Sequence, residues 1–108
     1  MKAAVFHGPD RPLSVEEVPT PTPGQGQVLI RVAACGVCHT DLHYTDHGTP
    51  TFKHPPMILG HEISGLVEAA GEGVKGLRAG DRVVVAAVTS CGACDACREG
   101  RENICAHG

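Results

Sequence analysis

The chain has 108 residues, the length of one domain, with a formal charge of −3 at pH 7 and only one tyrosine, two phenylalanines and no tryptophan. This composition provides neither the basic surface nor the aromatic stacking residues that are typical of nucleic-acid-binding proteins. Because the apolar run after Lys2 is too short for a signal peptide and no later segment approaches a membrane span, we expect a soluble, cytoplasmic protein without nucleic-acid or membrane partners.

Short apolar runs follow one another along the chain and are separated by glycine and proline. These runs are rich in Val, Ile and Ala, and they occupy residues 3–7, 13–18, 27–34, 62–70 and 81–88. Such spacing is typical of an antiparallel sandwich or barrel. The segment "VPTPTPGQGQ" at 18–27 predicts an extended connection, because proline has no backbone donor for a sheet.

Helical signals are weak. The stretch "CHTDLHYT" at 38–45 predicts two helical turns, and "DACREGRENI" at 95–104 predicts one or two. The run "GEGVKG" at 71–76 has the G-x-G-x-x-G spacing of a phosphate loop, but no helix follows it to supply a helix N-terminus. We therefore predict a loop between strands there, and place the chemistry on loops and short helices.

Four of the six cysteines have the spacing C-x2-C-x2-C-x7-C. They are Cys91, Cys94, Cys97 and Cys105. Two-residue spacers allow neighbouring thiolates to turn onto one ion, and four sulfurs form a closed structural zinc site. The alternatives are an iron–sulfur cluster, whose usual cysteine spacing differs, and unbound or oxidised cysteines, which are less expected in the cytosol.

A second group of potential ligands is split between "GVCHTDLH" at 36–43 and "GHE" at 60–62. Cys38 and His61 carry a thiolate and an imidazole, which both suit zinc. Two ligands make only half a site, so these residues alone are weak support for a metal.

The sequence resembles a known family through the combination of these motifs. "GVCHTDLH", "GHE", "AGDRVVV" and the four-cysteine run occur in this order over most of the chain. Together they resemble the N-terminal part of the catalytic domain of zinc-dependent medium-chain alcohol dehydrogenases. The resemblance implies a mainly β fold, namely a GroES-like partly open β-barrel with short helices and a zinc-binding loop lobe.

The resemblance also implies roles around a catalytic zinc, in addition to the structural zinc of the four cysteines. Cys38 and His61 match two zinc ligands, and Glu62 matches an occasional alternative ligand. Asp41, which otherwise looks like a helix-start residue, would accept a hydrogen bond from the far nitrogen of His61. Cys35 matches no ligand position, and we expect it to be a small buried thiol.

Other positions match the residues that handle substrate and cofactor. Thr40 and His43 would form the proton relay, and His39 would contact the cofactor pyrophosphate. Zinc would polarise the alcohol as a Lewis acid, and hydride would pass to the nicotinamide of NAD or NADP. Ala87 matches a substrate-pocket position, although a plain core alanine is an equal alternative. Without the resemblance, these histidines would be ordinary surface residues.

We expect one domain over residues 1–108, with the zinc lobe at about 88–108. In the family, a third catalytic-zinc ligand and the Rossmann cofactor domain lie further along the chain, and neither is present in this sequence. We therefore expect part of an alcohol dehydrogenase that oxidises alcohols to aldehydes or ketones. By itself the chain would be inactive, and the full-length protein would be a homo-oligomer acting on a small alcohol or carbonyl substrate.

Two alternatives to this function remain open. One is a zinc-stabilised GroES-like binding module without catalytic activity, since a fold by itself does not fix function. The other is a polyol or threonine dehydrogenase of the same family.

Overall fold

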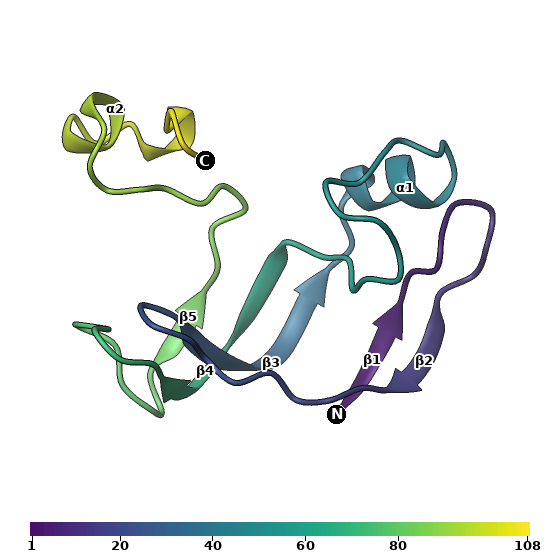
Figure 1. The fold of residues 1–108 in the computed structure, drawn as a ribbon, viewed down its shortest axis with the longest axis horizontal. Coiled ribbons are helices and arrows are strands. Elements are labelled where there is room, and N and C mark those ends of the chain that lie inside the picture. Colours follow the sequence, from purple (N-terminus) through teal and green to yellow (C-terminus); the bar gives the residue numbers. More distant parts are fainter.

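The computed structural model describes all residues, 1–108, as a mainly β chain with short helices at its loops (Figure 1). The strands are β1 (Lys2–Val5), β2 (Ser14–Glu17), β3 (Val28–Gly36), β4 (Glu62–Ala70) and β5 (Arg82–Val84). The helices are α1 (His39–Thr45), α2 (Asp95–Arg98) and the 3-10 turn η1 (Glu102–Ile104). Each strand overlaps a predicted apolar run, although β1 begins one residue before its run, β3 ends two residues after its run, and β5 ends at Val84 although its run continues to residue 88.

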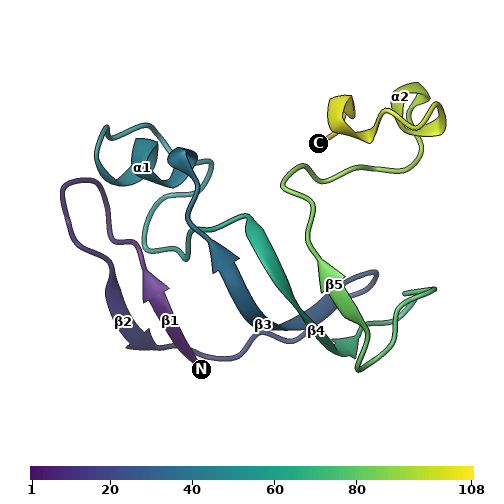
Figure 2. The same ribbon diagram turned by 180° about the vertical axis from the view of Figure 1, so that it is seen from behind.

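Two separate antiparallel sheets organise the chain. β1 pairs with β2, and β3, β4 and β5 form the second sheet with β4 at its centre. The bridge between Phe6 and Met57 ties the end of the first hairpin to the loop that precedes β4. The sheets lie next to each other without closing into a barrel (Figure 2). The predicted mainly β, antiparallel architecture is therefore confirmed, with an open arrangement.

The turns also follow the sequence. Residues 18–27 connect β2 to β3 without a helix or strand and contain a turn at residues 25–26, and residues 71–76 form a loop after β4 with no helix behind it. The phosphate-loop interpretation of "GEGVKG" is thereby excluded by structure as well as by context. No helix of the structure has the length and apolar character needed to cross a membrane.

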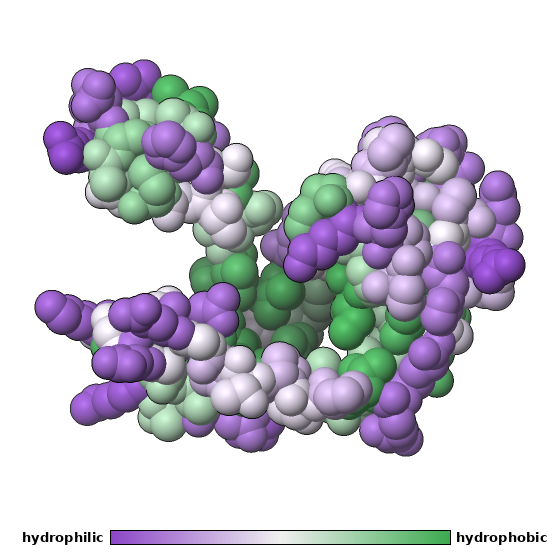
Figure 3. Space-filling view, in the orientation of Figure 1, coloured by the Kyte–Doolittle hydropathy of each residue, from purple (hydrophilic) through white to green (hydrophobic).

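The buried core is small, and its buried apolar side chains are Val5, Phe6, Val67 and Cys97. Phe6 and Val67 are each only 2% exposed, whereas Val84 on β5 is 84% exposed. We call residues 88–108 the cysteine lobe. Apolar side chains gather in a hollow between α1 and this lobe (Figure 3). The open apolar face follows from the sheet arrangement, because β5 has no further strand beside it.

Gly65 allows the two central strands to approach closely. A Cβ at this position would meet the backbone oxygen of Arg31, and it would come within 2.7 Å of the Ile30 side chain. We therefore expect Gly65→Ala to destabilise the fold by about 1–3 kcal/mol, because backbone on the neighbouring strand must move. Urea unfolding of the zinc-loaded protein measures this loss.

The matched control is Gly24→Ala. Its Cβ would meet only the side chain of Gln27, which can rotate away. Equal midpoints for the two variants would contradict the tight contact between β3 and β4.

Candidate metal centres

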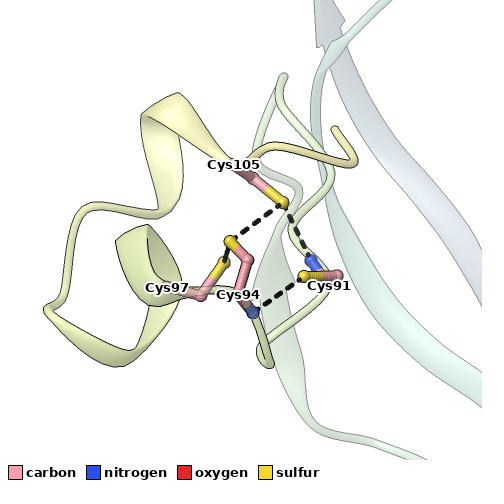
Figure 4. Close-up of side chains that lie close together, drawn as sticks. All are labelled: Cys91, Cys94, Cys97 and Cys105. Atoms are coloured by element: carbon pink, nitrogen blue, oxygen red, sulfur yellow. Dashed lines mark hydrogen bonds between the residues drawn. The ribbon is translucent and has the colours of Figure 1, made fainter.

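The four lobe cysteines converge from a loop, both ends of a short helix and a turn. Cys91 precedes α2, Cys94 caps its start, Cys97 lies inside it, and Cys105 follows η1. Their sulfurs lie within 4.8 Å of one another, with Cys94 Sγ 3.5 Å from Cys97 Sγ and 4.0 Å from Cys105 Sγ (Figure 4). All six cysteines of the chain are free.

The separations between these sulfurs fit a single tetrahedral ion. Four thiolates about 2.3 Å from zinc lie about 3.8 Å from one another. The observed 3.5 and 4.0 Å lie on either side of that value. An iron–sulfur cluster places its own sulfides between the cysteines and would hold their sulfurs further apart. The donor set therefore fits zinc better than the iron–sulfur alternative.

Backbone amides around the cluster favour thiolates, whereas burial opposes them. The N–H groups of Ala93 and Cys94 point at Cys91 Sγ at 3.4 Å and lower the pKa of that thiol. Hydrogen bonds from the N–H groups of Ala106 and Cys97 lower the pKa of Cys94 to about 6. Burial raises the pKa of Cys97 to about 12. A bound cation would favour the ionised form of all four sulfurs together.

The second cluster joins two distant parts of the sequence. Cys38 is the N-cap of α1, directly after β3, whereas His61 and Glu62 stand at the start of β4. Pairing of β3 with β4 sets Gly36 opposite Glu62, and the donor atoms of Cys38, His61 and Glu62 lie within 4.8 Å of one another. The sheet register therefore assembles this group.

Cys38 and His61 influence each other's protonation. Hydrogen bonding with the backbone and hydroxyl of Thr40, and then with His61, lowers the pKa of Cys38. The hydrogen bond to Cys38 raises the pKa of His61. In the absence of a metal, this thiol and imidazole can share a proton. That proton would have to leave before both groups could bind a metal ion.

Asp41 lies beside this group, and its two carboxylate oxygens have different surroundings. Its Oδ2 accepts a hydrogen bond of 3.0 Å from the Cys38 N–H, which closes the capping box of α1. Its Oδ1 is buried without a hydrogen-bond partner and lies 3.9 Å from His61 Nδ1, beyond hydrogen-bond reach. A metal-bound histidine usually donates its other ring N–H to a carboxylate, and the unpaired buried oxygen of Asp41 that faces the imidazole fits this arrangement.

The remaining predicted residues of the helix divide between its two sides. Thr40 Oγ1 lies 3.6 Å from Cys38 Sγ. His39 and His43 are exposed, and their ring centroids lie 5.0 Å apart in an edge-to-face arrangement. These two histidines are not among the residues that line the adjoining cavity, whereas Thr40 is.

A cavity of about 480 Å³ lies next to the second cluster. The structure brings together four residues that the sequence predicted from separate segments, because Thr40, Asp41, His61 and Ala87 all line this cavity. Most of the remaining wall comes from residues that the sequence did not single out, namely Tyr44, Thr51, Phe52, Met57, Ile58 and Leu59. The sequence could have indicated these residues only by their position, because all of them lie between the two ligand motifs.

One expectation about a single residue was wrong. Cys35 is exposed rather than buried. It is near the end of β3, where its sulfur packs against Gly60 and lines a second cavity of about 420 Å³. The open sheet leaves that end of β3 uncovered, so a small apolar residue there is not enclosed.

Comparison with known proteins places the chain. Residues 24–108 match the family described as the alcohol dehydrogenase GroES-like domain. The chain belongs to this family. The expected GroES-like fold and the resemblance to the N-terminal part of zinc-dependent alcohol dehydrogenases are thereby confirmed.

Individual relatives agree with this membership. An alcohol dehydrogenase of Moraxella sp. (strain TAE123) is 49% identical over 97% of this chain and 31% of its own length. The cobalt- and zinc-bound thermostable alcohol dehydrogenase from Pyrobaculum aerophilum has a TM-score of 0.85 at 39% identity, over 98% of this chain and 32% of that one. An alcohol dehydrogenase from E. coli CFT073, complexed with NADH, has a TM-score of 0.78 at 39% identity, over 97% and 30%. The GroES-like chain spans about a third of the length of these relatives.

Proposed function

We propose that residues 1–108 are the N-terminal part of the catalytic domain of a zinc-dependent alcohol dehydrogenase, with the cysteine lobe as its structural-zinc unit. The enzyme would oxidise alcohols to aldehydes or ketones with NAD or NADP, held mainly by a Rossmann domain outside this sequence. The observation that carries the proposal is the Cys38, His61 and Glu62 group, whose donor atoms lie within 4.8 Å beside a cavity lined by Thr40 and His61.

Two zinc ions would divide between the two clusters. The four lobe sulfurs leave no position for water or substrate, which suits a structural ion. Cys38 and His61 supply two donors next to the cavity, and Glu62 supplies an exposed carboxylate as an alternative third. When bound there, zinc would supply the Lewis-acid charge that polarises an alcohol oxygen.

The side chains of α1 would position the substrate and remove its proton. Thr40 lines the cavity, so its hydroxyl can take the proton that the alcohol loses while it passes its own proton onward. His43 is one turn further along α1 and exposed, which suits transfer of that proton to solvent. His39, exposed at the start of α1, would contact the cofactor pyrophosphate. Ala87 leaves room in the wall for substrates larger than ethanol.

Asp41 would orient His61 in this site. We expect Asp41→Asn to weaken zinc binding or activity by about 10–100-fold, because the buried carboxylate that faces His61 Nδ1 loses its charge. Asparagine can still accept the Cys38 N–H, so α1 should keep its cap. Zinc retention against a competing chelator measures the effect.

Asp46→Asn is the matched control for this change. Asp46 is an exposed carboxylate at the C-cap of α1, where it accepts a hydrogen bond from Thr45. Equal zinc retention in the Asp41 and Asp46 variants would contradict the orienting role.

The reaction itself is tested by alcohol-dependent formation of NADH or NADPH. The zinc-loaded full-length protein should turn over, and a panel of primary alcohols, secondary alcohols and polyols would define its substrate class. The 108-residue chain alone should not turn over, because it has no fold that holds a nicotinamide. Robust turnover by the short chain would refute the proposal that cofactor binding needs a further domain. A full-length protein that is inactive on every alcohol would refute the proposed function.

A further inference from the structure

Three histidines follow one another at four-residue intervals along and beyond α1. His39 and His43 belong to the helix, and His47 lies two residues beyond its last residue. The ring centroids of His39 and His43 are 5.0 Å apart, and those of His43 and His47 are 5.5 Å apart. All three side chains are exposed. Helical residues four apart share one face, so the proximity of His39 and His43 follows from the sequence, whereas His47 lies outside the helix.

The spacing of the first pair fits two imidazoles on one ion. With metal–nitrogen bonds of about 2.0–2.1 Å, two rings on a shared metal have centroids about 4.5–5.2 Å apart, depending on the angle between the bonds. The His39–His43 pair falls in this range at 5.0 Å. The His43–His47 pair falls just outside it at 5.5 Å.

The charged residues that flank this pair along the chain are acidic, which also favours a cation. Between Arg31 and Lys53 the chain contains Asp41 and Asp46 but no lysine or arginine. Exposed imidazoles remain hydrated and gain little from packing against each other, whereas two of them on one helix face are a known arrangement for zinc.

We propose that His39 and His43 form a third metal site, separate from both cysteine-containing clusters, for a borderline divalent ion such as Ni²⁺, Zn²⁺ or Cu²⁺. Two neutral imidazoles and water would complete its coordination. The consequence rests on the proposed function: a metal here occupies the lone pairs of the residues assigned to cofactor contact and proton transfer. Occupation of this site would therefore inhibit the enzyme.

Nickel uptake by the zinc-loaded full-length protein tests the site. After dialysis against Ni²⁺, nickel and zinc per chain are counted, and the affinity is measured by titration calorimetry. We expect one additional nickel with zinc unchanged. We also expect His39→Gln and His43→Gln each to weaken nickel binding at least about tenfold, as for loss of other residues around a metal.

Two exposed histidines provide matched controls. His47→Gln removes the neighbour outside the proposed pair, and His54→Gln removes a histidine from another loop, and both should keep nearly the full nickel affinity. The proposal is overturned if nickel uptake is matched by zinc loss, if His43→Gln binds normally, or if His47→Gln is as weak as His39→Gln. None of these measurements involves alcohol or nicotinamide, so failure of the proposed function would leave the result interpretable.

Discussion

Cys97→Ser should reduce the zinc content from two ions to one per chain and unfold the cysteine lobe. Cys97 is 8% exposed, and its sulfur lies 3.5 Å from that of Cys94, inside the group of four. Structural zinc contributes about 10–16 kcal/mol of binding free energy that acts as folding free energy. The lobe holds only four residues of α-helix and a 3-10 turn, so little else maintains its order.

Zinc content and limited proteolysis would show this loss. Cleavage should map to residues 88–108, whereas the β3–β4–β5 sheet should stay resistant because its hydrogen bonds do not involve the lobe. Cys35→Ser is the matched control, since Cys35 is a free cysteine outside both clusters. Two retained zincs and an uncut lobe in Cys97→Ser would show that the four sulfurs do not hold an ion.

The features that sequence alone predicted well are local. The cysteines of the lobe are close in the chain, so their spacing was sufficient to predict that they converge. The strands were predicted because each run of Val and Ile is bounded by glycine or proline. The end of β5 was not predicted, because it depends on pairing with β4. That pairing stops at Val84.

Features that depend on distant contacts were predicted only in part. The group of Cys38, His61 and Glu62 needs the register in which Gly36 lies opposite Glu62, and no local pattern encodes that register. The same holds for the wall of the cavity, where Phe52 and Ile58 belong to no motif. The wrong expectation for Cys35 has this origin too, because its exposure depends on what covers the end of β3.

The two clusters also differ in what their loss should affect. The lobe cluster is local and closed, so its ion would stabilise structure without touching substrate. The Cys38 group is assembled by the sheet and lies at a cavity, so its ion would act on substrate while the sheet stands without it. Removal of one ligand from each cluster should therefore give opposite patterns of stability and activity.

Cys38→Ser should abolish alcohol oxidation and leave the lobe folded. Loss of the thiolate removes one of the two proposed zinc donors, Cys38 and His61. The Lewis-acid contribution lost with zinc is several kcal/mol. We expect kcat/KM to fall at least about a hundredfold, which corresponds to about 2.7 kcal/mol. Steady-state kinetics and zinc content of the full-length enzyme measure the change.

The comparison with Cys97→Ser makes this result specific. Both variants should hold one zinc, but only Cys97→Ser should be cleaved in the lobe, and Cys35→Ser, three residues from Cys38, should keep both ions and full activity. Normal activity of Cys38→Ser with one zinc would contradict the catalytic role of this group. An enzyme that loses activity together with lobe resistance would instead show that the two clusters are coupled through the fold.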